Sequence, residues 1–174
     1  MMLLLDKPMK NRIKTKKLAL LAMCTAVAMV LSFVESQIPA FVPIPGVKAG
    51  LANIAVIFCL YRLGKGEAVI VSLVRVFLVS LLFGSIMSLW YSLAGAVISY
   101  AGMVLMKRSG RFSCVSVSVL GGVLHNLGQI AMACILLETD LISYYAPFLV
   151  LSGTVAGIIT GASAAILITR IPEM

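Results

Sequence analysis

The side chains best suited to chemistry lie in residues 121–129, which read Gly-Gly-Val-Leu-His-Asn-Leu-Gly-Gln. This segment sits inside residues 113–137, which contain no Asp, Glu, Lys or Arg and are long enough to cross a bilayer as a helix. His125 and Gln129 would share one helix face, whereas Asn126 points about 100° away from His125. Because polar groups in hydrocarbon are costly without partners, we expect these side chains to face a bundle interior or a cavity.

Three glycines, Gly121, Gly122 and Gly128, remove side-chain bulk around these polar groups. Either another helix or a ligand is therefore expected to pack closely against this segment.

A second set of polar residues is expected in the membrane or near its outer side. Arg75 lies roughly 10 Å into its predicted span, where an arginine costs about 2.5–3.5 kcal/mol on insertion scales. Arginine offers paired donors to carboxylate or phosphate groups. We therefore predict an outward-facing cavity for a small anionic or polar ligand. The predicted substrate-binding residues are Lys48, Asn53, Arg75, His125, Asn126 and Gln129.

Structural roles remain open for the same residues. Arg75 could form an internal ion pair with Glu35 or another acid, and His125 could make a hydrogen bond between helices. Glu138 and Asp140 follow the span of His125 and place acidic groups at its outer end.

Catalytic and metal-binding patterns are missing from the sequence. It holds no DDxxD, HExxH, GxSxG or GxxxxGK[ST] motif. The cysteines Cys24, Cys59, Cys114 and Cys134 stand singly in apolar segments and are interpreted as packing residues. We expect no enzymatic activity, no metal and no cofactor, so any use of ATP would belong to partner subunits.

The composition is that of an integral membrane protein. The 174 residues are 61% hydrophobic and 11% charged, with a mean hydropathy of +1.12. The formal charge of +8 does not indicate nucleic-acid binding, because the chain offers no soluble basic face. Residues 1–34 resemble a signal peptide superficially, but further spans follow and we expect an uncleaved first helix.

These features predict an all-α fold, a bundle of six transmembrane helices. A basic cytoplasmic arm (1–17) precedes a single membrane domain (18–170) and a short tail (171–174). The predicted spans are residues 18–34, 49–61, 67–83, 86–106, 113–137 and 148–169. Gly153, Gly157 and Gly161 recur every four residues in the last span and predict close helix packing.

Residues 35–48 are apolar but rich in proline, which forbids a regular helix. We interpret this segment as a lid that folds back over the bundle, with a stiff connector at the rim as the alternative. The residues that would shape such a lid are Glu35, Pro39, Pro43, Pro45 and Gly46.

The basic residues predict the orientation. With both termini in the cytoplasm, 12 of the 14 Lys and Arg residues fall on the cytoplasmic side. Lys48 alone falls in an outer loop, and Arg75 lies within the membrane.

Three elements together resemble the Gx transporter family, which is also labelled heptaprenyl diphosphate synthase component I. They are Glu35 with the segment Pro-Gly-Val-Lys-Ala-Gly-Leu-Ala-Asn (45–53), Arg75, and the segment 121–129. That family is similar to the substrate-binding S components of energy-coupling factor (ECF) transporters, which are six-helix bundles of bacterial cytoplasmic membranes.

The resemblance implies further properties. It implies a lid in the first loop and docking of the first helix onto a membrane T component through small residues such as Ala22 and Ala26. Two ATPase subunits would drive the T component. The alternatives are a membrane subunit that assists a soluble polyprenyl diphosphate synthase and, ranked last, a stand-alone secondary carrier, since no half-to-half similarity is evident.

Overall fold

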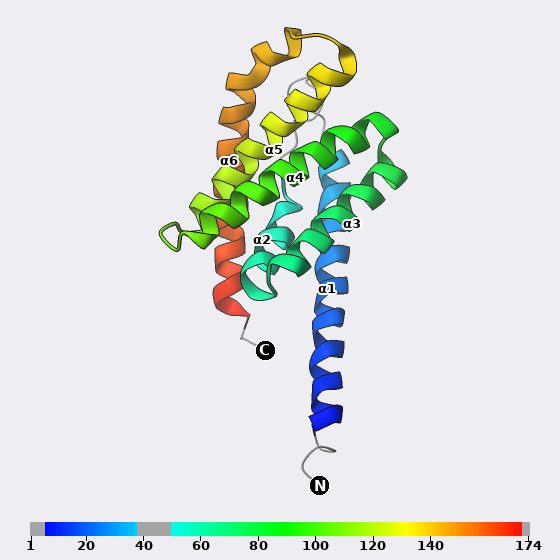
Figure 1. The fold of residues 1–174 in the computed structure, drawn as a ribbon, viewed down its shortest axis with the longest axis vertical. Helices are drawn as coiled ribbons and strands as arrows, with labels where there is room; N and C mark the ends of the chain where they lie inside the picture. Colours follow the sequence, from blue (N-terminus) through cyan, green and yellow to red (C-terminus); the bar gives the residue numbers. More distant parts are fainter. Residues whose placement is uncertain (1–5, 38–49, 172–174) are drawn as a thin grey trace.

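The computed structural model describes residues 6–37 and 50–171, with side chains described from Thr15 onward. Within these ranges the chain is helical, without strands (Figure 1). The elements in order are α1 (Asp6–Gln37), α2 (Asn53–Arg62), α3 (Lys65–Phe83), α4 (Ile86–Arg108), α5 (Cys114–Leu137), the 3-10 helix η2 (Leu141–Tyr145) and α6 (Ala146–Arg170).

Five of the described helices are long and apolar enough to cross a membrane, namely α1, α3, α4, α5 and α6. The chain is therefore a multi-pass membrane protein, and the predicted spans near 18–34, 67–83, 86–106, 113–137 and 148–169 match these helices. The predicted second span, 49–61, corresponds to α2. This helix has only ten residues and is therefore about 15 Å long. It cannot cross a bilayer of roughly 30 Å alone.

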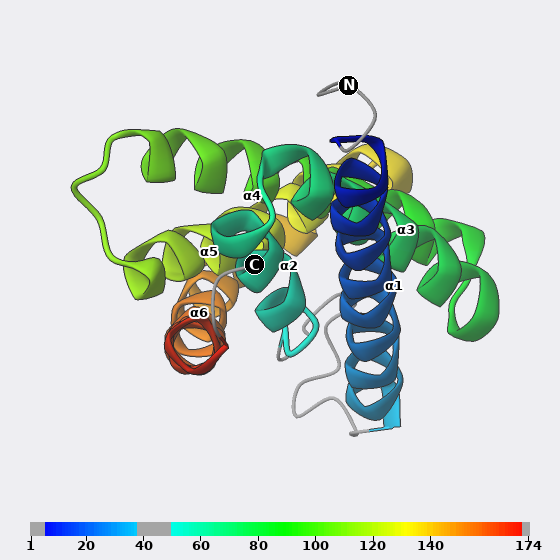
Figure 2. The same cartoon turned by 90° about the horizontal axis from the view of Figure 1, so that it is seen from below.

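Burial explains how such a short helix is stabilised. Six consecutive residues of α2, from Ala55 to Leu60, are buried, so neighbouring helices cover all of its faces. The helix α2 packs mainly against α3, α6 and α1, and Figure 2, seen from below, shows it near the centre of the molecule. The main core cluster is built around α2 and includes Cys24 and Ala28 of α1.

Serine and glycine residues set the helix ends. Ser85 begins α4 with a capping box, in which its side chain and that of Ser88 each accept a backbone N–H of the other residue. Ser113 caps α5 in a similar way through the backbone N–H of Ser116. Gly64 and Gly110 have positive φ angles at the turns before α3 and α5. Short turns at glycine and serine residues therefore separate these helices.

Glycines bring α5 into close contact with both neighbours. A Cβ atom at Gly122 would lie 2.5 Å from the carbonyl oxygen of Gly153, and one at Gly157 would lie 2.5 Å from the Cα of Val119. On the other side, a Cβ at Gly95 of α4 would lie 2.7 Å from the carbonyl oxygen of His125. The glycine stripe of α6 therefore serves helix packing, as predicted.

The helix α1 lies at the side of the bundle, against α2 and α3 (Figures 1 and 2). It begins at Asp6, so residues 6–17 of the predicted basic arm belong to the same helix as the first span. Ala22 and Ala26 lie on its exposed face rather than in the interior.

One end of the bundle carries basic residues that cap neighbouring helices. The guanidinium of Arg62 donates to the carbonyl oxygens of Ile168 and Ile171 at the end of α6. Lys107 donates to the carbonyl oxygen of Leu60 at the end of α2, and its ammonium lies 4.5 Å from the centre of the Tyr61 ring. The beginning of α1 and the end of α6 lie toward this same end (Figure 1).

Candidate functional site

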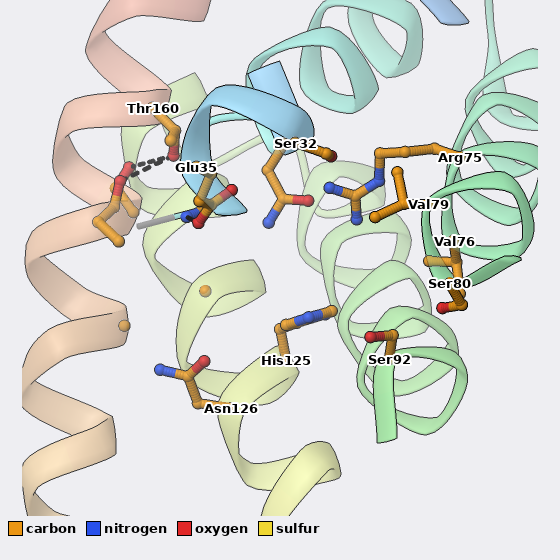
Figure 3. A pocket seen from close by; sticks show the side chains of 16 residues that line it. Ser32, Glu35, Arg75, Val76, Val79, Ser80, Ser92, His125, Asn126 and Thr160 are labelled. Atoms are coloured by element: carbon orange, nitrogen blue, oxygen red, sulfur yellow. Dashed lines mark hydrogen bonds between the residues drawn. The ribbon is translucent and has the colours of Figure 1, made fainter. Parts of the chain in front are cut away.

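A polar cavity lies between the two halves of the helical chain (Figure 3). Half of its lining comes from α1, α3 and the start of α2, and half from α4, α5 and α6. The lining residues are Ser32, Glu35, Gly50, Asn53, Arg75, Val76, Val79, Ser80, Ser92, Gly122, His125, Asn126, Gly153, Ala156, Gly157 and Thr160. We call this space the central cavity.

The size of the central cavity limits what it holds in this conformation. Its volume is about 50 Å³. One water molecule needs about 10–15 Å³ by the same kind of measure, so the space accommodates a few waters or one compact solute group.

Arg75 is the cation of the central cavity. It lies on α3, is only 9% exposed, and points its guanidinium toward the cavity (Figure 3). Its Nε–H is buried and has no hydrogen-bond acceptor among the described residues. A buried donor without an acceptor is costly, and the other N–H groups of the guanidinium are the ones that a ligand or a water molecule in the cavity would meet.

Glu35 supplies the opposite charge from the last turn of α1. It is buried, and its carboxylate acts electrostatically on Arg75. One carboxylate oxygen also accepts the backbone N–H of Gly50 at 2.5 Å. Glu35 therefore joins the end of α1 to the start of α2 while it offsets the charge of Arg75. Ligand contact and pairing with an acid both remain open as roles for Arg75.

His125 and Asn126 reach the central cavity from α5, but they differ in their contacts. The amide nitrogen of Asn126 donates to the carbonyl oxygen of Leu149 at 2.8 Å and to the hydroxyl of Ser152 at 3.3 Å. Asn126 thus connects α5 to α6. His125 lies beside Gly95 of α4 and lines the cavity (Figure 3).

Gln129 is not among the residues that line the central cavity. It is 3% exposed and packs against Gly95, with its Oε1 lacking a hydrogen-bond donor among the described side chains and backbone. It shares a helix face with His125, as predicted, but that face is directed at α4.

Asn53 reaches the cavity from the first turn of α2. Gly50, three residues earlier, has a φ of +73° and accepts the backbone N–H of Asn53 at 2.8 Å, so a tight turn delivers both residues to the cavity. Lys48 and the lid positions Pro39, Pro43, Pro45 and Gly46 lie outside the described residues. Glu138 and Asp140 are exposed near the turn after α5 and do not line the cavity.

The sequence interpretation missed several lining residues. Ser32, Ser80, Ser92 and Thr160 bring hydroxyl groups from four different helices. Hydroxyl-bearing residues in apolar spans were the available signal, but many such residues only bond their own helix, as Ser163 does with the carbonyl of Ile159. Gly153 and Gly157 both line the cavity and pack α6, a double role that spacing alone does not reveal.

The chemistry available in the central cavity is hydrogen bonding around a compensated charge pair. Among the described residues, no three His, Cys, Asp or Glu side chains are grouped in a way that could hold a metal ion. The arrangement is suited to binding a small polar molecule through several helices at once.

A family model described as heptaprenyl diphosphate synthase component I matches residues 24–167. No curated protein and no solved structure matches the chain. The matched range begins within α1 and extends into the last turn of α6, so it contains every described residue that lines the central cavity.

Proposed function

Because the chain belongs to the heptaprenyl diphosphate synthase component I family, and because its helices enclose a polar cavity, we propose that it is the substrate-binding S component of an ECF-type transporter. It captures a small anionic or polar nutrient at the outer side of the bacterial cytoplasmic membrane. The energy comes from partner subunits.

The central cavity is the observation that carries this proposal. A membrane protein avoids burying polar groups without partners, yet here an arginine, a carboxylate, two side-chain amides, an imidazole and several hydroxyls converge from all six described α-helices. The guanidinium of Arg75 faces the cavity and offers N–H donors to a solute there. Binding, rather than a reaction, is the role that such a set supports, and we propose that the chain is not an enzyme.

The exposed face of α1 supports the assignment of partners. Ala22 and Ala26 lie one turn apart on that face, which also carries the exposed residues Met23, Val27 and Val30. Small residues one turn apart allow another helix to approach closely. We propose that this face docks onto a membrane T component, which two ATPase subunits drive, and that ATP is used only by those subunits.

The test is purification of the chain from its native host in mild detergent, followed by mass spectrometry of the co-purified proteins. We expect a T component and two ATPases. A soluble prenyl synthase without ATPases would contradict the proposal and favour the role that the family description names.

A variant pair tests the docking face. We expect Ala22→Leu with Ala26→Leu to reduce recovery of the T component strongly, because two bulky side chains separate the helices. Ala131→Leu is the matched control, since Ala131 is an exposed alanine on α5. Equal recovery with the double variant and the control would show that α1 is not the docking surface.

A further inference from the structure

The charges of the central cavity restrict the ligand more narrowly than its polarity does. Arg75 and Glu35 are the only Lys, Arg, Asp or Glu side chains among the described lining residues. Their formal charges cancel, and the other polar side chains of the described lining belong to Ser, Thr, Asn and His125. We propose, on the basis of the proposed function, that the solute bound here is compact and carries no net charge.

The position of Arg75 defines one group of that solute. Its guanidinium is directed at the cavity, where its terminal N–H groups form a hydrogen-bond donor for a solute. A ligand with a carbonyl or carboxylate oxygen satisfies this donor. A neutral amide or a zwitterion provides such an oxygen without adding net charge to the site.

Glu35 makes a multiply charged ligand unfavourable. Its carboxylate lines the same cavity as the guanidinium of Arg75, and it accepts the backbone N–H of Gly50. A diphosphate would place several negative charges beside this carboxylate in a site shielded from water, where uncompensated charge is costly. Lys48, which lies outside the described residues, would raise the formal charge of the lining by one at most.

The volume of the central cavity also favours a compact solute. A space of about 50 Å³ holds a few water molecules, far less than a polyprenyl chain occupies. Backbone contacts such as that of Gly122 with Gly153 leave the wall formed by α5 and α6 little freedom to retreat. The central cavity is thus unsuited to the substrates and products of prenyl transfer.

The first experiment identifies retained small molecules by mass spectrometry after purification of the wild-type chain, Arg75→Gln and Thr154→Ala. Thr154 bonds within α6 and does not line the cavity, so its variant is the control. We expect a compound without net charge at pH 7 in the wild type and the control, reduced roughly tenfold or more in Arg75→Gln. A retained compound with a net charge, or retention that does not depend on Arg75, would overturn the proposal.

A second experiment uses defined probe compounds. It tests the net charge of the bound solute even if the purified chain retains no small molecule. Thermal unfolding is measured with nicotinamide, proline, nicotinate and isopentenyl diphosphate. We expect stabilisation by a net-neutral probe and none by the two anions. Stabilisation by either anion, or by no probe at all, counts against the proposal.

The variant Glu35→Gln tests whether Glu35 sets the preference of the cavity for a solute without net charge. The glutamine keeps an acceptor for the backbone N–H of Gly50 but leaves Arg75 uncompensated. We expect this variant to be stabilised by nicotinate more than by nicotinamide. An unchanged preference would show that Glu35 does not set the charge of the site.

The two proposals fail in distinguishable ways. Loss of the transporter assignment would appear as missing T component and ATPases, whatever the ligand. Failure of the charge limit would appear as a charged compound bound to a chain that still assembles with those partners.

Discussion

At the scale of single residues, Arg75 and Glu35 show how a membrane protein retains a buried charge. An arginine within a span costs about 2.5–3.5 kcal/mol on insertion scales, and a nearby carboxylate offsets part of that cost. Here the offset is incomplete, because the Nε–H of Arg75 has no acceptor among the described groups. Such a residue is poorly suited to structure alone and well suited to binding.

Arg75→Lys separates the charge of this residue from its hydrogen-bond geometry. The lysine keeps a positive charge for Glu35 but lacks the planar guanidinium and its paired N–H donors. We expect retention of the bound solute to fall by the equivalent of about 1.5–3 kcal/mol, as for a hydrogen bond to a charged group. The retained amount is quantified by mass spectrometry, and an unchanged amount would assign Arg75 a purely electrostatic role.

Asn126 has a structural role that can be measured by itself. Asn126→Leu removes the hydrogen bonds to Leu149 and Ser152 of α6. We expect a loss of about 0.6–2 kcal/mol in the free energy of unfolding, the range for hydrogen bonds between membrane helices. Thermal unfolding in detergent tests this. Thr154→Val, which removes a bond within one helix, should have a smaller effect.

At the scale of elements, the short helix α2 and the glycine contacts of α5 position the site. The α2 helix starts at the central cavity with Asn53 and ends at the basic end, where Lys107 caps it. The close contacts of α5 with α4 and α6 fix the wall that carries His125 and Asn126. The cavity therefore lies between a wall packed backbone to backbone and the side formed by α1, α2 and α3.

Gly122→Ala tests the backbone contact between α5 and α6. The added Cβ would lie 2.5 Å from the carbonyl oxygen of Gly153, which is backbone and cannot turn aside. We expect a loss of about 1–3 kcal/mol in the free energy of unfolding, typical of overpacking. Gly66→Ala is the control, because a Cβ there meets nothing within 4 Å in α3. That variant should be neutral or slightly more stable.

At the scale of the whole molecule, charge determines how the bundle sits in the membrane. Basic residues gather at one end, where Arg62 and Lys107 cap helices and Lys17 pairs with Glu67. The opposite end carries η2 with its exposed Tyr144 and Tyr145. The positive-inside rule predicts that the basic end faces the cytoplasm, and both described ends of the chain lie toward that end.

Cysteine labelling of intact cells measures this orientation. In a chain whose four native cysteines are replaced, we expect Tyr144→Cys to react with a membrane-impermeant maleimide. Ser109→Cys, in the basic turn between α4 and α5, should react only after the membrane is permeabilised. The opposite pattern would mean that the bundle is inverted.

The sequence by itself determined the helical class, the membrane location and most of the element boundaries. Apolar runs of bilayer length and the glycine or serine turns between them are local features, so α3 to α6 follow from composition and spacing alone. The identity of the polar residues in those runs also indicated Asn53, Arg75, His125 and Asn126 as candidates, and all four line the central cavity.

Tertiary structure decided the remaining features, because they depend on which faces meet. Helix periodicity puts Gln129 beside His125, but only the packing of Gly95 against α5 directs Gln129 away from the cavity. Ser32 and Thr160 are about 130 residues apart in the sequence and reach the same space only after the helices assemble. The compensation of Arg75 by Glu35 likewise arises between α1 and α3, and no spacing rule within one helix contains it.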